Sequence, residues 1–243
     1  MNYRITIAYD GTDYQGWQLQ NEKPTIQRAF NAALENIEGR PVIIHGAGRT
    51  DSGVHAEGQV ASFRLSREWA GEKLRAAING NLPRDIRVLD AHPVPDEFHA
   101  RFDARGKSYR YQLCTSEVMT PLLLRYAWHY ARPFDQELLA ETAQVLLGTH
   151  DFSVFTVASC ETRTRVRTLK SFQLETAGPV WQMSFSGDGF LRYMVRRMVS
   201  TLLALNRRKL RPASFEEVVA LCEQTRGSTL APARGLTLMK VEY

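Results

Sequence analysis

Cysteine is scarce in this sequence, and no run of apolar residues is long enough to cross a membrane. The three cysteines, Cys114, Cys160 and Cys222, are far apart and odd in number. Such cysteines favour free thiols in a reducing compartment over a disulfide framework. The amino terminus leads directly into a strand pattern instead of a signal peptide. We therefore expect a cytoplasmic protein without a membrane segment.

Patterns that bind metals or nucleotides are also missing. No two of the six histidines are three or four positions apart, and no Cys-x-x-Cys occurs, so a zinc site is not expected. Gly46 and Gly48 are not followed by the Gly-Lys-Ser/Thr of a phosphate-binding loop, and no dinucleotide fingerprint follows a predicted strand. We infer no cofactor and no metal ion.

The composition is that of a globular protein whose positive charge is unevenly distributed. Hydrophobic residues make up 44% and charged residues 23% of the 243 positions, and the net charge is +5. Residues 1–105 hold 13 basic and 14 acidic side chains, whereas residues 106–243 hold 18 basic and 12 acidic. Arginine supplies most of the basic residues and binds phosphate well. An arginine-rich solvated surface would give the same numbers, so both readings stay open.

The first half of the chain has the periodicity of a β-α-β-β-α-β unit. Thr25 precedes one apolar helical stripe that Gly39 ends. This order is that of ferredoxin-like folds and RNA-recognition modules, which form a four-stranded antiparallel sheet with both helices on one face. The patterns predict strands over residues 3–9, 42–44, 59–65 and 86–91, and helices over residues 26–38 and 68–79.

The second half repeats this theme more loosely. A helix predicted over 215–224 is capped by Ser214 and ended by Gly227. We assign residues 1–104 to an N-terminal ferredoxin-like half and residues 105–243 to a more basic C-terminal one, which together make an α+β fold. The other predicted elements are strands over residues 108–113, 165–174, 180–185 and 236–241, and helices over residues 136–147 and 190–206.

The segment Gly46–Ala56 carries the most chemistry for its length. Three glycines surround a single carboxylate, Asp51, and Arg49 lies two positions before it. Glycine permits backbone angles that other residues avoid and lets a ligand approach closely. A hairpin turn would also be rich in Gly and Asp. Eleven residues are long for a plain turn, and a functional loop is favoured.

This segment resembles the catalytic motif of the tRNA pseudouridine synthase I (TruA) family in its residues Gly48-Arg49-Thr50-Asp51-Ser52-Gly53-Val54-His55-Ala56. Further family-like stretches follow one another in the family's order over nearly the full length. They are Tyr9–Gln18, Phe98–Phe102, Tyr109–Tyr111, Gly189–Leu191 with Met194–Arg196, and Ala231–Leu236.

The resemblance implies a fold and an activity. The family has two α+β halves that share a mostly antiparallel sheet, with helices on one face and the active-site cleft between the halves. It isomerises uridine to pseudouridine at nucleotides 38, 39 and 40 of the tRNA anticodon arm, without a cofactor and as a homodimer. The expected partners are therefore tRNA and a second copy of the chain.

The resemblance also assigns roles to five residues. Asp51 matches the nucleophile, and a carboxylate can attack or stabilise a sugar cation when it is ionised. Arg49 matches an arginine that helps to extrude the base, and Arg196 matches one that pairs with the aspartate. Tyr109 matches a tyrosine that stacks on uracil and is a candidate for taking the C5 proton, and Leu236 matches a leucine that packs against the base. From periodicity alone, Tyr109 and Leu236 would be core residues and Arg196 a surface arginine.

Three basic clusters are candidates for contacting RNA phosphates, although each is equally consistent with ordinary surface charge. Two functions of other classes remain as alternatives. One is a non-catalytic RNA-binding module of the same fold. The other is a carboxylate glycosidase that uses Asp51 with Glu57. The three clusters are Arg101, Arg105, Lys107 and Arg110; Arg163, Arg165 and Arg167; and Arg207, Arg208, Lys209 and Arg211.

Overall fold

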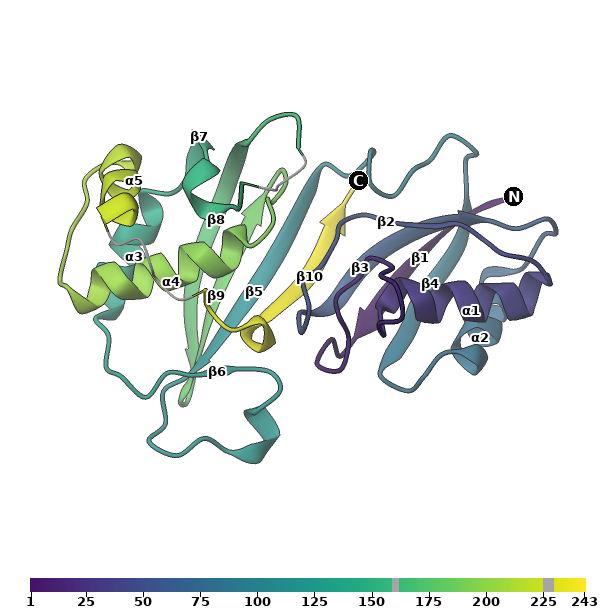
Figure 1. Cartoon of the computed structure of the whole chain (residues 1–243), viewed down its shortest axis with the longest axis horizontal. Helices are drawn as coiled ribbons and strands as arrows, with labels where there is room; N and C mark the ends of the chain where they lie inside the picture. The colour runs from purple at the N-terminus through teal and green to yellow at the C-terminus, as the bar shows by residue number, and fades with distance from the viewer. Residues whose placement is uncertain (159–161, 225–229) are drawn as a thin grey trace. The chain divides into compact units, whose positions relative to one another are not determined.

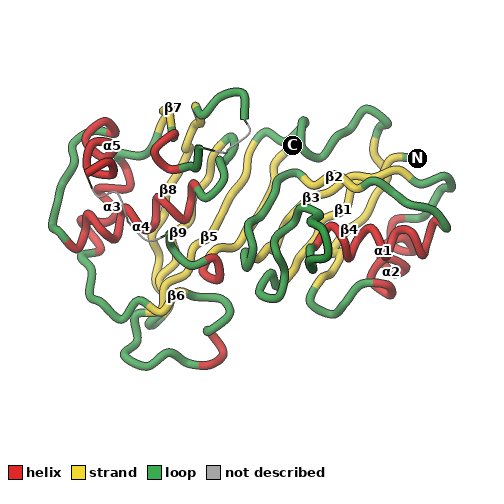
Figure 2. The backbone as a smooth tube through the Cα atoms, in the orientation of Figure 1, coloured by secondary structure: helices red, strands yellow, loops and turns green. Residues whose placement is uncertain are grey.

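The computed structural model describes residues 1–158, 162–224 and 230–243. The chain forms two compact units, one of residues 1–105 with 237–243 and one of residues 106–236. Figures 1 and 2 show their strands and helices, and each unit is described by itself. In the described parts of the chain, no helix combines the length and apolarity that crossing a membrane requires.

The first unit is built on a mostly antiparallel sheet with the strand order β4-β1-β3-β10. Strand β1 pairs antiparallel with β3 and β4, β2 pairs antiparallel with β3, and β10 runs parallel to β3. The predicted order β-α-β-β-α-β is confirmed. The elements are β1 (Asn2–Tyr9), α1 (Ile26–Glu38), β2 (Ile44–Gly46), β3 (His55–Arg64), α2 (Gly71–Asn81), β4 (Ile86–Val94) and β10 (Leu236–Glu242).

Burial explains why these residues form these elements. Alternate residues of β1 point to the core, so Ile5 and Ile7 are fully buried. The stripe of α1 buries Phe30 and Leu34. Thr25, which precedes the predicted stripe, caps this helix, because its hydroxyl accepts a hydrogen bond from the Arg28 N–H at 3.3 Å. Gly39 ends the helix with φ of 76°.

Several predicted boundaries in this unit are wrong. The strand expected over 59–65 lies at His55–Arg64, and the strand expected over 86–91 continues to Val94. The strand expected over 42–44 lies at Ile44–Gly46. The helix expected from residue 68 begins at Gly71 and continues to Asn81. Its delayed start has a tertiary cause, because the Trp69 N–H donates to the Tyr3 hydroxyl at 2.6 Å and so holds this stretch outside the helix.

The second unit has an antiparallel sheet with the strand order β5-β9-β8-β7, and β6 runs parallel to β5. Helices α3 and α4 pack against each other beside this sheet (Figure 1). Both units are therefore α+β with mostly antiparallel strands, as predicted. The elements are β5 (Gly106–Cys114), β6 (Trp128–His129), α3 (Gln136–Gln144), β7 (Gly148–Asp151), β8 (Val166–Ala177), β9 (Val180–Gly187), α4 (Met194–Arg207) and α5 (Phe215–Gln224).

Helix α4 differs from its prediction at the start. It begins at Met194 instead of Phe190, because Tyr193 takes a left-handed conformation with φ of 65°. Helix α3 ends at Gln144 instead of residue 147, because the next residues form tight turn bonds such as Leu146 N–H to the Ala143 carbonyl. Short strands β6 and β7 were not predicted. Helix α5 matches its prediction, but Gly227 lies outside the described residues.

Candidate active site

Asp51 lies in the connection between β2 and β3, called the Asp51 loop here (residues 47–54). Its carbonyl accepts a hydrogen bond from the Val54 N–H at 3.1 Å, which closes a turn around Ser52 and Gly53. Gly53 has φ of 76°, a value that favours glycine in a turn. Asp51 is partly exposed, so its side chain is accessible while its backbone is fixed.

A second stretch of the first unit, residues 10–18, holds the Asp51 loop, and we call it the cradle segment. The Trp17 N–H donates to the Thr50 carbonyl at 3.1 Å, and the Gly53 N–H donates to the Tyr14 carbonyl at 3.2 Å. The Ser52 hydroxyl also donates to the Tyr14 carbonyl, at 3.3 Å. The residues before and after Asp51 are thus tied to the cradle segment, which holds the backbone that carries Asp51.

Two glycines of the cradle segment make this close approach possible. A Cβ added to Gly16 would lie 2.4 Å from the Thr50 carbonyl oxygen and 3.0 Å from the Asp51 carbonyl carbon. A Cβ on Gly11 would lie 2.0 Å from the Val54 carbonyl oxygen. No real side chain tolerates these distances, so only glycine allows the two backbones to pack together here.

Buried aromatic residues complete the support. The hydroxyls of Tyr9 and Thr50 share a hydrogen bond of 2.8 Å. Burial raises the pKa of Tyr9 to about 12, so this hydroxyl stays neutral and the bond persists across the physiological range. The buried Trp17 ring packs against Gly46, where an added Cβ would come within 2.5 Å of it, and also lies beside Phe30.

His55, at the start of β3, connects the loop to the end of β1. Its Nδ1 accepts a hydrogen bond from the Gly11 N–H at 3.1 Å and lies 3.2 Å from the Asp10 carboxylate. The same Asp10 oxygen accepts bonds from the Thr12 N–H at 3.0 Å and the Thr12 hydroxyl at 2.6 Å. These groups anchor the first turn of the cradle segment.

Arg49 belongs to the Asp51 loop and is exposed. The Gln59 amide donates to the Gly48 carbonyl at 2.9 Å and so fixes the backbone just before Arg49. The guanidinium is therefore carried by an ordered backbone two residues from Asp51, where a cation favours the ionised carboxylate.

The other three predicted residues lie in the second unit, and two of them, Arg196 and Leu236, are at its segment 231–236. Tyr109 is buried on β5 and meets the Phe190 ring edge to face at 4.9 Å. The Arg196 Nε–H donates to the Ala231 carbonyl at 2.7 Å. Leu236, which ends this segment, is buried. The segment thus links the arginine of α4 to the leucine at the start of β10.

Tyr111 holds the segment 231–236 in place, a role that was not predicted from the sequence. Its hydroxyl donates to the Pro232 carbonyl at 2.8 Å, and its ring lies where a Cβ on Gly235 would be, at 2.7 Å. Burial raises the pKa of Tyr111 well above its usual value, which keeps the hydroxyl a donor. The only sequence signal was its place two residues after Tyr109, on the same strand face.

The helix predicted over 190–206 would contain both Arg192 and Arg196, but Arg192 precedes α4. Both guanidiniums lie over the Tyr193 ring, that of Arg192 at 4.8 Å and that of Arg196 at 5.4 Å from its centre. The left-handed backbone at Tyr193 turns its ring into this position, and such cation–π contacts orient both arginines.

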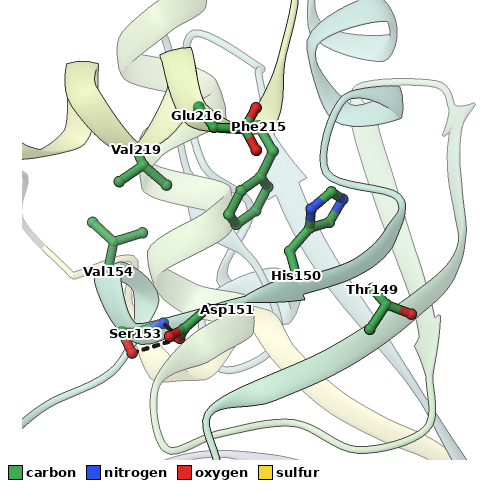
Figure 3. Close-up of a pocket in the computed structure, with 8 residues that line it drawn as sticks. All are labelled: Thr149, His150, Asp151, Ser153, Val154, Phe215, Glu216 and Val219. Carbon is green, nitrogen blue, oxygen red and sulfur yellow. Dashed lines mark hydrogen bonds between the residues drawn. The ribbon is translucent and has the colours of Figure 1, made fainter.

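Figure 3 shows a pocket of the second unit whose lining does not include the predicted site residues. The His150 ring stacks on Phe215 at 4.1 Å, and its Nε2 lies 2.7 Å from the Leu147 carbonyl. Asp151 accepts hydrogen bonds from the N–H and the hydroxyl of Ser153. These polar groups therefore hold the pocket wall together. The lining residues are Thr149, His150, Asp151, Ser153, Val154, Phe215, Glu216 and Val219.

Within the described residues, no three His, Cys, Asp or Glu side chains gather where they could hold a metal ion. The polar side chains described above for the candidate site are a carboxylate and arginines and tyrosines of the two units.

Comparison with known proteins identifies the family to which these residues belong. A family model described as tRNA pseudouridine synthase matches residues 5–103 and 142–243. The chain belongs to the tRNA pseudouridine synthase family. The resemblance found in the sequence is thereby confirmed. The matched residues contain the cradle segment, the Asp51 loop, Arg196 and Leu236, whereas Tyr109 lies outside them.

Individual relatives of this family match over their whole length. The chain is 39% identical to tRNA pseudouridine synthase A 1 of Desulfotalea psychrophila, across 100% of this chain and 99% of the relative. It is 40% identical to tRNA pseudouridine synthase A of Moorella thermoacetica, across 99% and 98%. It is 41% identical to tRNA pseudouridine synthase A of Methylacidiphilum infernorum, across 100% and 96%.

The close approach at Gly16 can be tested against a matched glycine. Gly39 also has a positive φ, of 76°, but nothing lies within 4 Å of a Cβ added there. Gly39→Ala should lower the free energy of unfolding by about 1 kcal/mol, the cost of a left-handed alanine. Gly16→Ala adds the collision with the Asp51 loop and should cost about 2–5 kcal/mol. Chemical denaturation measures both changes.

Amide hydrogen exchange shows which hydrogen bonds each glycine substitution weakens. In Gly16→Ala the amides of Trp17 and Gly53 should lose protection, since their acceptors are Thr50 and Tyr14. In Gly39→Ala they should keep it. Equal stability of the two variants, with both amides still protected, would show that the packing of the loop on Gly16 is unimportant.

Proposed function

We propose that this chain isomerises uridine to pseudouridine at nucleotides 38, 39 and 40 of the tRNA anticodon arm. The observation that carries the proposal is the immobilised Asp51 loop, which holds its backbone in place through bonds to Trp17 and Tyr14. Membership of the tRNA pseudouridine synthase family supports the same reaction. A tRNA substrate also favours a cytoplasmic location.

The proposed reaction needs no co-reactant. The bond between N1 of uracil and C1′ of ribose breaks, the base rotates, and a bond forms between C5 and C1′. N1 gains a proton, and C5 loses one. Asp51 acts as the nucleophile or stabilises the sugar cation, and it must be ionised for either role. A carboxylate held in place before the substrate arrives costs little reorganisation during the reaction.

Four further residues are proposed to contact the target nucleotide. Arg49 helps to extrude the base, and unstacking a base from RNA needs such a replacement contact. Tyr109 stacks on the uracil and takes the C5 proton through its hydroxyl. Arg196 supplies a fixed positive charge, and Leu236 packs against the base. The hydrogen bond of Arg196 to the Ala231 carbonyl supports a fixed role for this guanidinium.

We further propose that basic side chains of residues 106–243 neutralise tRNA phosphates. These residues hold 18 basic and 12 acidic side chains, and their charge suits a polyanion. Arg165 and Arg167, at the start of β8, are held by bonds to the Ala158 and Thr164 carbonyls. An arginine whose stem is already ordered loses less entropy when it binds phosphate.

A homodimer is proposed as the working form. The connection between β5 and β6 leaves Val118 79% exposed and Leu122 84% exposed. Exposed apolar side chains of this size mark interaction surfaces when they are grouped. A second copy of the chain covering this connection would remove them from water.

The experiment that tests the proposal is incubation with unmodified tRNA, followed by mapping of pseudouridine through a chemical adduct. We expect modification confined to nucleotides 38–40. Binding without any pseudouridine would favour the RNA-binding module. Release of free base or sugar would favour the glycosidase that uses Glu57.

Removing one hydroxyl tests the role of Tyr109. Tyr109→Phe keeps the ring, so tRNA binding should persist while turnover falls by about 10²–10⁴-fold, the usual contribution of an acid–base group. Tyr130→Phe in the same unit removes a hydroxyl without this role and serves as the control. Full turnover in Tyr109→Phe would leave this residue with a stacking role only.

A further inference from the structure

Three aromatic side chains of the first unit form a cluster that the proposed reaction does not use. The rings of His45 and His99 lie 4.8 Å apart, and those of His99 and Phe102 lie 4.4 Å apart. Phe102 is 75% exposed, although a phenylalanine is usually buried. We call the rings of His45, His99 and Phe102 the aromatic platform.

The turn that carries two of these rings is rigid. The His99 N–H donates to the Asp103 carboxylate at 2.8 Å, and the Arg101 N–H donates to His99 Nδ1 at 3.1 Å. The N–H groups of Phe102 and Asp103 both donate to the His99 carbonyl at 3.1 Å. Backbone and ring are therefore fixed together before any ligand arrives, which reduces the entropy lost on binding.

The platform also carries the features that recognise a flat, electron-rich ring. Burial and the neighbouring His99 lower the pKa of His45, so its imidazole is neutral at pH 7 and packs without charge repulsion. The Arg101 guanidinium lies 5.9 Å from the centre of the Phe102 ring. Exposed aromatic rings beside an arginine are the usual surface on which unpaired bases stack.

The platform is close to Asp51 along the chain. His45 lies on β2, six positions before Asp51. Six residues span at most about 20 Å even when fully extended. A stacked nucleic-acid strand rises about 3.4 Å per nucleotide, so this distance corresponds to about six nucleotides.

We propose that the aromatic platform binds an unpaired base of the RNA substrate, within a few nucleotides of the uridine that reacts. The inference rests on the proposed function for its substrate and adds a second contact point on it. Each bound RNA would then be held by stacking at the platform as well as by contacts at the target base.

The surroundings favour a base over a phosphate or a protein. Residues 95–105 contain three acidic and two basic side chains, so the acidic side chains of this segment offset the charge of Arg101 and Arg105 and its net charge does not favour phosphate. A stable protein interface needs about 20–30 residues on each side, whereas the platform consists of three rings on a compact turn. Stacking requires only an accessible ring face.

The test compares Phe102→Leu and Phe102→Trp with the wild-type protein. Each is titrated with an anticodon stem-loop RNA and with a fully paired RNA duplex, over a series of salt concentrations. Phe102→Leu keeps an apolar side chain but removes the ring, and it should weaken stem-loop binding by about 5- to 150-fold. Phe102→Trp should bind within about twofold of wild type, because a larger ring still stacks.

Two further readouts separate stacking from other causes. Duplex binding should not change, and the slope of log affinity against log salt should be the same in all three proteins, because no phosphate contact is lost. Leu89→Ala, which alters a 47% exposed side chain on β4, is the control for a general surface effect and should bind both RNAs normally.

Several results would overturn the proposal. Wild-type affinity of Phe102→Leu for the stem-loop would do so, as would equal loss on stem-loop and duplex. A change in sedimentation of Phe102→Leu would assign the platform to a contact between copies of the chain. If wild-type protein forms no pseudouridine, the proposed activity fails while the stem-loop titration still decides whether the platform binds bases.

Discussion

The first unit depends on a contact between two backbones that only glycine allows. The Thr50 carbonyl oxygen lies where a side chain on Gly16 would begin, at 2.4 Å from an ideal Cβ. This approach lets the Trp17 N–H reach the same carbonyl at 3.1 Å. It also brings the Tyr14 carbonyl within reach of Ser52 and Gly53. The Asp51 loop, its cradle segment and the packing of Trp17 on Gly46 all follow from this one constraint.

One consequence is that the backbone carrying the Asp51 carboxylate is held in place. Asp51 is partly exposed, while its neighbours Thr50 and Ser52 are tied to the cradle segment by hydrogen bonds. The second unit uses a similar device, in which the Tyr111 ring occupies the space beside Gly235 and its hydroxyl holds Pro232. In both units a glycine of a family-like stretch packs against an aromatic ring or a carbonyl group. This packing fixes the backbone beside a candidate site residue.

The sequence was a good guide wherever local chemistry decides the structure. Helix α1 was predicted with its caps because Thr25 and Gly39 act on adjacent residues. The start of α4 was wrong because periodicity does not reveal the left-handed backbone at Tyr193. The last strand was predicted near residues 236–241, but its parallel pairing with His55 and Ala56 depends on residues far away in the chain.

The same limit applies to the candidate site. Asp51 stood out because glycines and an arginine surround it in an unusually long connection. The stretch Tyr9–Gln18 was noted only for its resemblance to the family, since its role in holding the loop depends on contacts between Gly16 and Thr50 that no local pattern encodes. The role of Tyr111 was not predicted, because its hydrogen bond to the Pro232 carbonyl joins distant parts of the chain.

The role proposed for Asp51 is most directly tested with the variant Asp51→Asn. Its single-turnover rate of pseudouridine formation is measured beside a filter-binding titration with tRNA. Asparagine has nearly the same shape, so the fold and the affinity for tRNA should be retained. Pseudouridine formation should fall by several orders of magnitude, since asparagine is a poor nucleophile. Asp90→Asn, on the exposed part of β4, should react like wild type. Turnover of Asp51→Asn within about tenfold of wild type, or about 1.4 kcal/mol in barrier, would contradict the account.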